Sequence, residues 1–288
     1  MSVSVAICVK NSEKYIADCL ISLLNQTHTD FEIVIVDDLS TDNTQKEIEK
    51  FTDKRIKYFR NPKVLGLSNS RNQCLKLANN QYMFFTDSDC IVSKNWIEEG
   101  LKYLELTNSV GVEGKTYYVS EDYKPTRSDS VIENKQGGEF LTSNIAYKKN
   151  VIESIGGFDE RLFYLEDRDL ALRVIKQGKI FFNPKMIVRH QKKSLNKEQF
   201  VQEGKRLRNR VLLYKKSKDK PRSLFFGRIV GPADFAGLIF PPLIFVGIIS
   251  KRHKSKADFD LIPFIYVRLV IERLNFWDMC AREKVFLI

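Results

Sequence analysis

Two aspartates separated by one serine follow an apolar segment in "FFTDSDC", where Asp87 and Asp89 lie two positions apart. Side chains at positions i and i+2 of an extended segment point to the same side, so these two carboxylates would repel each other. A divalent cation between them and an anionic ligand removes that repulsion, because Mg²⁺ and Mn²⁺ take carboxylate oxygens as ligands. The pattern is common by chance, so it needs support from the rest of the chain.

Other polar residues also mark the ends of predicted elements. Asp38 ends the apolar segment "FEIVIVDD", Glu166 and Asp167 begin a predicted helix, and His190 ends "MIVRH". Each has a simpler explanation: an aspartate can cap the following helix, acidic side chains are favoured at a helix N-terminus, and a single histidine is more often structural than a ligand. It is their combination, at the ends of separate elements, that indicates a site.

Residues 1 to about 120 alternate apolar segments with patterns typical of helices. Strands are predicted at 3–9, 31–38, 55–59 and 82–86, and helices at about 15–26, 40–51, 69–78 and 94–106. This alternation predicts right-handed βαβ units and therefore an α/β fold with a mainly parallel sheet flanked by helices. Ligands of such sheets bind beyond the carboxyl ends of the strands, which is where Asp38, Asp87 and Asp89 fall.

The block from about 137 to 190 has its own pattern. It predicts a small strand near 143–147, a short helix, a glycine turn at Gly156–Gly157, a helix from Glu166, and two further strands, "KIFFN" and "MIVRH". Neither a GxGxxG fingerprint nor a Walker lysine loop is present in the sequence. A nucleotide bound here would therefore need a metal ion to hold its diphosphate.

The net charge of +11 is concentrated in one part of the chain. Residues 185–222 contain fourteen Lys and Arg against three Asp and Glu, and the remainder is balanced. Such a local excess fits an appendage that faces a nucleotide, a nucleic acid or an anionic membrane. The five cysteines lack metal-ligand spacing, and no signal peptide precedes the first predicted strand, so we expect a cytoplasmic protein.

Several motifs in one order carry a family resemblance. "VDDLSTD", "LGLSNSRNQCLKLANNQYMFFTDSDC", "GGFDERLFYLEDRD" and "VRH" resemble glycosyltransferase family 2, the inverting nucleotide-sugar transferases of the GT-A fold, and the likeness covers residues 3–190. It implies a GT-A catalytic domain at 1–190, with a nucleotide-sugar half at 1–120 and an acceptor half at 121–190. Residues 191–288 would form a basic and apolar helical appendage.

The resemblance also implies roles on the donor side. Asp38 would accept a hydrogen bond from the nucleobase, and Val9 and Asn11 would lie near the nucleoside. Arg71, in "SNSRN", would lie toward the donor nucleotide, and Asp87 would approach the ribose or the donor sugar.

On the chemical side, the resemblance implies that Asp89 and His190 bind Mn²⁺ or Mg²⁺ and that Asp167 is the catalytic base, with Glu166 orienting it or touching the acceptor. A metal ion would neutralise the leaving diphosphate. One positioned carboxylate would take the acceptor proton, an effect of about 10²–10⁴-fold. Because no second, nucleophilic carboxylate is evident, we expect a single displacement that inverts the anomeric centre.

Two alternatives stay open, one a different enzyme and one a non-catalytic protein. A sugar nucleotidyltransferase would use a similar sheet, but it is expected to carry a glycine-rich phosphate loop that this sequence lacks. A non-catalytic basic protein that binds nucleic acid through residues 185–222 would leave the aspartates unexplained, so no nucleic-acid partner is expected. Since neither Trp96 nor Trp277 lies in a QxxRW motif, transfer of one sugar is favoured over polymerisation.

The C-terminal region contains two apolar stretches, one at 235–249 and one that Arg268, Glu272 and Arg273 interrupt. A membrane-spanning helix needs about 20 apolar residues, and the first stretch contains the Pro241–Pro242 pair. We expect this region to lie in or dip into an anionic membrane interface, with a helical cap on the catalytic domain as the alternative. The enzyme would then act on a glycan or lipid-linked acceptor at the cytoplasmic membrane face.

Overall fold

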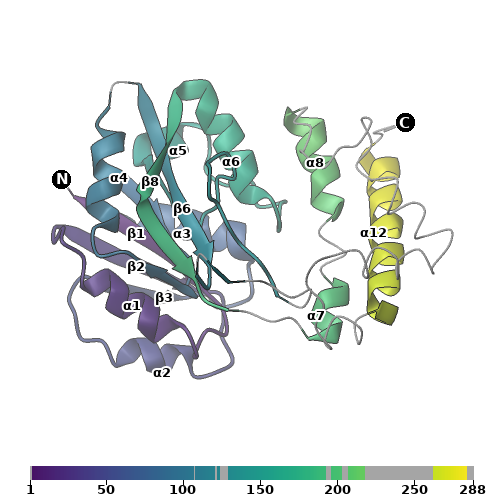
Figure 1. The fold of residues 1–288 in the computed structure, drawn as a ribbon, viewed down its shortest axis with the longest axis horizontal. Coiled ribbons are helices and arrows are strands. Elements are labelled where there is room, and N and C mark those ends of the chain that lie inside the picture. The colour runs from purple at the N-terminus through teal and green to yellow at the C-terminus, as the bar shows by residue number, and fades with distance from the viewer. Residues whose placement is uncertain are drawn as a thin grey trace. The chain divides into compact units, whose positions relative to one another are not determined.

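The computed structural model describes residues 2–106, 108–120, 122–123, 129–192, 196–202, 207–217 and 262–283. The chain divides into two compact units, Met1–Glu121 with Ile132–Gln191, and Asp122–Val131 with Lys192–Ile288. Figure 1 shows the sheet of the first unit and the helices of the second.

The described residues of the first unit form one eight-stranded sheet, in the order β3-β2-β1-β4-β7-β6-β8-β5. Its strands are β1 Val3–Val9, β2 Phe31–Asp37, β3 Ile56–Arg60, β4 Tyr82–Phe85, β5 Cys90–Val92, β6 Ser109–Tyr118, β7 Ile145–Lys148 and β8 Lys179–His190. The α/β fold class expected from the sequence is confirmed.

The sheet is mixed in direction. The pairs β3–β2, β2–β1 and β1–β4 are parallel, as the βαβ pattern predicts, and β6–β8 is parallel as well. The pairs β4–β7, β7–β6 and β8–β5 are antiparallel. The sequence pattern missed β5 and β6. It also divided β8 in two, whereas the structure has one strand whose register against β6 shifts between Asn183 and Ile187, where Pro184 lacks an N–H to pair.

Helices cover both faces of this sheet, which explains why its inner strands are mostly apolar on both sides. The helices of this unit are α1 Ile16–Leu24, α2 Thr44–Glu49, α3 Leu67–Leu77, α4 Trp96–Leu104, α5 Lys149–Ser154 and α6 Glu166–Val174, followed by the 3₁₀ turn η1 Ile175–Gln177. One core joins β1 to α1 and α4 through residues such as Ile7, Leu20 and Trp96. The other joins the opposite face to α3 and α6, through Cys74 and Leu170 among others.

The described part of the second unit is helical. It contains α7 Lys197–Gln202, α8 Leu207–Ser217 and α12 Ile262–Glu283. Arg268 of α12 lies over the Phe200 ring at 4.8 Å, and Lys215 pairs with Glu283 at 2.7 Å. Among the helices that the structure describes, none has the length and apolar character needed to cross a membrane. The apolar stretch 235–249 lies outside the described residues.

Candidate active site

The loop that carries the two aspartates leaves β4 and is held on both sides by hydrogen bonds. Ser88, the residue between them, lies with its Oγ 2.8 Å from the Oγ of Ser12, in the loop after β1. On the other side, the amide of Gln191 donates to the carbonyl oxygen of Asp89 at 2.8 Å. A small residue between the aspartates therefore has a structural reason: Ser88 ties this loop to the loop that follows β1.

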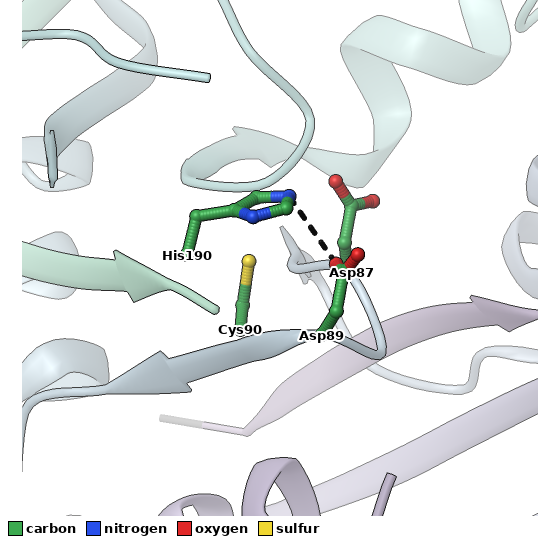
Figure 2. Close-up of side chains that lie close together, drawn as sticks. All are labelled: Asp87, Asp89, Cys90 and His190. Atoms are coloured by element: carbon green, nitrogen blue, oxygen red, sulfur yellow. Dashed lines mark ion pairs between the residues drawn. The ribbon is translucent and has the colours of Figure 1, made fainter. Parts of the chain in front are cut away.

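Pairing of β5 with β8 brings His190 to the same place. Cys90 is directly opposite His190 in that antiparallel pair, and Figure 2 shows His190 and Cys90 beside Asp87 and Asp89. One ligand atom from each of the four residues lies within 4.8 Å of the others. The His190 ring is 2% exposed and Asp89 is 8% exposed, so the cluster is largely shielded from solvent.

The hydrogen bonds of His190 set which of its nitrogens can bind a metal ion. Its Nδ1 lies 2.9 Å from the carbonyl oxygen of Gln191, and a carbonyl can only accept, so Nδ1 carries the proton. Nε2 faces Asp89, whose Oδ1 is 3.3 Å away. A cation bound between these two atoms would have both of them as ligands. Donation of the other ring nitrogen to a backbone carbonyl is also the usual arrangement of metal-binding histidines.

The donor set fits a hard divalent cation. Two carboxylates and an imidazole are suited to Mn²⁺, and to Mg²⁺ where substrate oxygens and water complete an octahedron. Cys90 fits less well, because burial, together with Asp87 and Asp89, raises the pKa of its thiol well above the ordinary value. Asp89 and His190 are therefore the residues that would hold the ion, with Asp87 beside them.

A second group of residues lies where β1 and β2 end. The amide of Asp38 donates to the carbonyl oxygen of Val9 at 2.9 Å. Asn11, at a φ of 52°, accepts from the amide of Thr41 through Oδ1 at 2.8 Å, and its own amide donates to Ser40 Oγ at 2.9 Å. These contacts join the two loops that follow β1 and β2.

Asp38 holds the segment that precedes α3. Its Oδ1 accepts from Asn61 Nδ2 at 3.0 Å and from the amide of Leu65 at 2.7 Å, and its Oδ2 accepts from the amide of Gly66 at 3.0 Å. Burial opposes ionisation, but these donors and Lys10 outweigh it and lower the pKa of the carboxyl. Asp38 is thus an ionised carboxylate that shapes the loop before α3, a role that the sequence did not suggest.

Asp37, one residue earlier, is structural. Its Oδ1 accepts from the amide and the hydroxyl of Ser40, and its Oδ2 accepts from the Tyr58 hydroxyl at 2.7 Å. The side chain is fully buried. The two adjacent aspartates therefore have different surroundings.

Arg71 of α3 lies between two acidic residues. Its guanidinium donates to Glu166 Oε1, and its other terminal nitrogen is 3.5 Å from Asp87 Oδ1. The guanidinium also lies over the Phe158 ring, 5.6 Å from its centroid. Arg71 is 4% exposed; burial would lower its pKa, but Glu166 and Asp87 raise it above the ordinary value. The side chain is a permanent cation held between β4 and α6.

The Glu166–Asp167 pair begins α6, directly after Leu165, which adopts a left-handed conformation with φ 64° and ψ 18°. Glu166 is 5% exposed, and Asp167 Oδ1 accepts from the amide of Arg168 at 2.7 Å. Burial and the negative charge of Glu166 raise the pKa of Asp167 to about 7, against the opposing effects of Arg71 and the Arg168 amide. A carboxylate with this pKa can accept a proton near neutral pH.

The structure thus brings the predicted site residues together in three groups. Asp87, Asp89 and His190 form a cluster that could hold a cation, and Glu166 and Asp167 connect to Asp87 through Arg71. The third group lies at the ends of β1 and β2 and consists of Val9, Asn11 and Asp38. Sequence reasoning missed Ser12 and Cys90, because a lone serine and a cysteine without spacing partners give no signal before β1, β5 and β8 are placed.

Comparison with known proteins assigns this arrangement to a family. The model of the family Glycosyl transferase family 2 matches residues 4–159, more than half of the chain. The Escherichia coli protein UDP-Glc:alpha-D-GlcNAc-diphosphoundecaprenol beta-1,3-glucosyltransferase WfaP is 32% identical over 171 residues, which cover 59% of this chain and 68% of WfaP. The chain spans 35%, 54% and 53% of the length of three other curated glycosyltransferases, about half of their length or less.

Solved glycosyltransferases share the fold. S. aureus TarS in complex with UDP-GlcNAc matches with a TM-score of 0.63 at 20% identity, covering 100% of this chain and 93% of that one. Mannosyltransferase PcManGT from Pyrobaculum calidifontis, in complex with GDP-Man and Mn²⁺, matches with a TM-score of 0.61 at 16% identity, covering 96% of this chain and 87% of that one. The expected GT-A fold is confirmed, the protein is an enzyme of the transferase class, and the chain belongs to glycosyl transferase family 2.

Proposed function

We propose that this enzyme is a metal-dependent inverting glycosyltransferase that moves one sugar from a nucleoside-diphosphate sugar to a hydroxyl of a glycan or lipid-linked acceptor. The observation that carries the proposal is the continuous series from a cation site to a base: Asp89 and His190, then Asp87, then Arg71, then the Glu166–Asp167 pair. WfaP acts on a diphosphoundecaprenol-linked sugar, and PcManGT was solved with Mn²⁺, which supports both parts. Family membership favours this activity over nucleotidyl transfer and over nucleic-acid binding.

The donor would bind beyond the carboxyl ends of the parallel strands. Val9 and Asn11 would lie beside the nucleoside. Asp38 would accept a hydrogen bond from the nucleobase while it also holds the loop before α3. Its Oδ2 receives one amide hydrogen bond, so a lone pair remains for this contact. Arg71 would act on the donor side through Asp87, which would approach the ribose or the sugar.

Asp89 and His190 would hold Mn²⁺ or Mg²⁺ next to the diphosphate. When bound, the ion supplies positive charge that stabilises the leaving nucleoside diphosphate without a proton donor. The chain's own contribution is to orient His190 through the Gln191 carbonyl and to fix the loop of Asp89 through Ser88.

Asp167 would act as the base. As the acceptor oxygen forms its bond to the anomeric carbon, Asp167 would take the hydroxyl proton, and the bond between that carbon and the diphosphate oxygen would break on the opposite side. Because a single carboxylate has this role, the configuration would invert. Glu166 would orient Asp167 or contact the acceptor, and its Oε1 accepts a hydrogen bond from Arg71.

Residues 1–190 would form the catalytic domain, and residues 191–288 would associate with the anionic cytoplasmic face of the membrane. Support comes from the fourteen basic residues between 185 and 222, and from WfaP, whose name specifies an undecaprenol-linked acceptor. We expect no nucleic acid among the partners.

Thermal unfolding with a panel of nucleoside diphosphates, each with and without Mn²⁺, tests the proposal and identifies the nucleobase of the donor. A ligand that binds only the native state raises the melting temperature. Stabilisation by one nucleoside diphosphate that EDTA abolishes is the expected result. If every member of the panel left the melting temperature unchanged, the proposed function would be wrong.

A further inference from the structure

We propose that Arg71 is a positioning residue for the base: its guanidinium holds the Glu166 carboxylate and so fixes the first turn of α6, where Asp167 lies. The same guanidinium touches Asp87, so the donor side and the base share one cation. This inference rests on the proposed function, and it differs from the donor-binding role that the family resemblance implies for Arg71.

The geometry around Arg71 supports positioning. The side chain is 4% exposed, its guanidinium donates to Glu166, and it lies over the ring of Phe158, which is itself buried. The second contact, to Asp87 Oδ1 at 3.5 Å, is longer and reaches a partly exposed carboxylate. The stronger partner of Arg71 is therefore on the base side, and a planar fork fits this bridge better than a lysine ammonium does.

The α3 helix holds the chain before α6 by two other contacts, which provide controls. Asn72 accepts from the amide of Phe158 at 2.8 Å and donates to its carbonyl oxygen at 3.0 Å. Ser68 Oγ donates to the carbonyl oxygen of Leu162. Both side chains bind the segment before α6 without contacting Glu166 or Asp87, the two carboxylates that Arg71 joins. Their loss would weaken the link between α3 and this segment but would leave these charges in place.

Asp167 reports on the bridge because the groups that face it come from several elements. Burial raises the pKa of Asp167 most, Glu166 on α6 and Asp87 after β4 raise it further, and Arg71 on α3 lowers it. Tyr147 on β7 also faces Asp167: burial and, after it, the charge of Asp167 raise the pKa of the Tyr147 hydroxyl. Removing the Arg71 guanidinium leaves the carboxylates of Glu166 and Asp167 beside each other without a neighbouring cation. The pair then takes up its first proton at a higher pH than in the unmodified enzyme.

The experiment compares Arg71→Lys, Arg71→Met and Asn72→Ala, with a nucleoside-diphosphate sugar that carries the nucleobase identified by the thermal-unfolding screen. For each protein, the donor dissociation constant is measured by calorimetry, and kcat for release of the nucleoside diphosphate is measured from pH 5.5 to 9. We expect both Arg71 variants to bind the donor within about threefold of wild type and to lose about 10²-fold in kcat, the scale of a small misplacement of a catalytic group. The pH at which kcat falls to half of its plateau on the acidic side should stay the same in Arg71→Lys and in Asn72→Ala. In Arg71→Met it should move to a higher pH.

Because Arg71→Met leaves Glu166 buried without its partner, that variant could fail to fold. The double variant Arg71→Met with Glu166→Gln removes both charges, and we expect it to fold, to bind donor and to retain the loss in kcat. Variants that lose donor affinity while kcat stays at the wild-type value would overturn the inference and make Arg71 a donor ligand. A double variant with wild-type kcat would overturn it as well. A wild-type protein that binds no nucleoside-diphosphate sugar would instead refute the proposed function, and this inference with it.

Discussion

His190 Nε2 lies 3.3 Å from Asp89 Oδ1, although the two residues are about a hundred positions apart in the chain. The β5–β8 pair produces this proximity, because it sets Cys90 opposite His190 and so places Asp89 next to the ring. Hydrogen bonding of Nδ1 to the Gln191 carbonyl orients the ring so that Nε2 faces Asp89. Backbone pairing and a backbone hydrogen bond therefore set the geometry of this cluster, which could hold a cation.

Asp89→Asn should abolish metal-dependent binding of nucleoside diphosphate, because it removes the negative charge that balances the cation while it keeps the shape of the side chain. Calorimetric titration of the nucleotide with and without Mn²⁺ measures this change. Glu98→Gln, an exposed neutralisation on α4, is the matched control and should bind as the wild type does. Undiminished, still metal-dependent affinity in Asp89→Asn would remove Asp89 from the metal site.

Asp167→Asn should leave donor binding within about threefold of wild type and lower transfer by about 10²–10⁴-fold, the usual contribution of a positioned base. The amide keeps the volume of the side chain and its acceptor for the Arg168 amide. Single-turnover transfer, beside a donor titration on the same protein, separates the two effects. If affinity and turnover fell together, Asp167 would have a structural or metal-binding role instead.

The N-terminal half of the sheet could be predicted from the sequence because β1, β2 and β4 are mostly apolar runs in a chain that alternates strands with helices. β6 could not, because "SVGVEGKTYY" mixes glycines and charges that only neighbouring segments explain: Glu113 is buried and accepts from the amides of Gly138 and Phe140 in the loop before β7. A Cβ at Gly111 would lie 2.6 Å from the Tyr147 ring, a constraint that no pattern in the chain displays.

The site shows the same division. Residue types and strand ends indicated Asp38, Asp89 and Asp167, since a carboxylate at the end of a strand or the start of a helix is visible in the sequence. The placement of Arg71 between Asp87 and Glu166 depends on how α3 packs beside α6, a long-range relationship that spacing does not encode. Cys90 joined the cluster for the same reason, through strand pairing.

Transfer should lose rate as the pH falls through about 7, because Asp167 must be ionised to accept a proton and its pKa is raised to about 7. The rate should follow the ionised fraction of one group, so log(kcat) should rise with a slope near one below the midpoint and level off above it. A pH–rate profile at saturating donor and metal measures this. A profile that stays flat from pH 5.5 to 8 would show that Asp167 does not supply the base.

The same pKa makes a prediction about stability. In the unfolded chain, an aspartate loses its proton near pH 3.9, whereas folded Asp167 holds its proton up to about pH 7. The folded state therefore binds more protons between these values, so Asp167 makes folding less favourable as the pH rises through this window. Asp167→Asn should raise the melting temperature at pH 8 and change it little at pH 4. Scanning calorimetry at pH 4 and pH 8 measures the two changes in melting temperature. Equal changes at the two pH values would contradict the prediction.

The basic residues between 185 and 222 should bind anionic vesicles, and the apolar stretch 235–249 should add a part that salt does not remove. Each basic residue near such a surface contributes about 1 kcal/mol and is screened by salt, whereas apolar burial is not. Flotation of the full chain with phosphatidylserine vesicles should therefore decrease from 50 mM to 500 mM salt without vanishing.

Two sets of Gln variants test where the salt-sensitive part resides. Exchange at Lys205, Arg206, Arg208 and Lys216 should remove most of it. The same exchange at exposed lysines of the first unit, Lys14, Lys46, Lys63 and Lys76, should leave it nearly unchanged. Equal losses from the two sets would mean that attraction depends on net charge alone, and a full chain that ignores the vesicles at 50 mM salt would remove the case for membrane association.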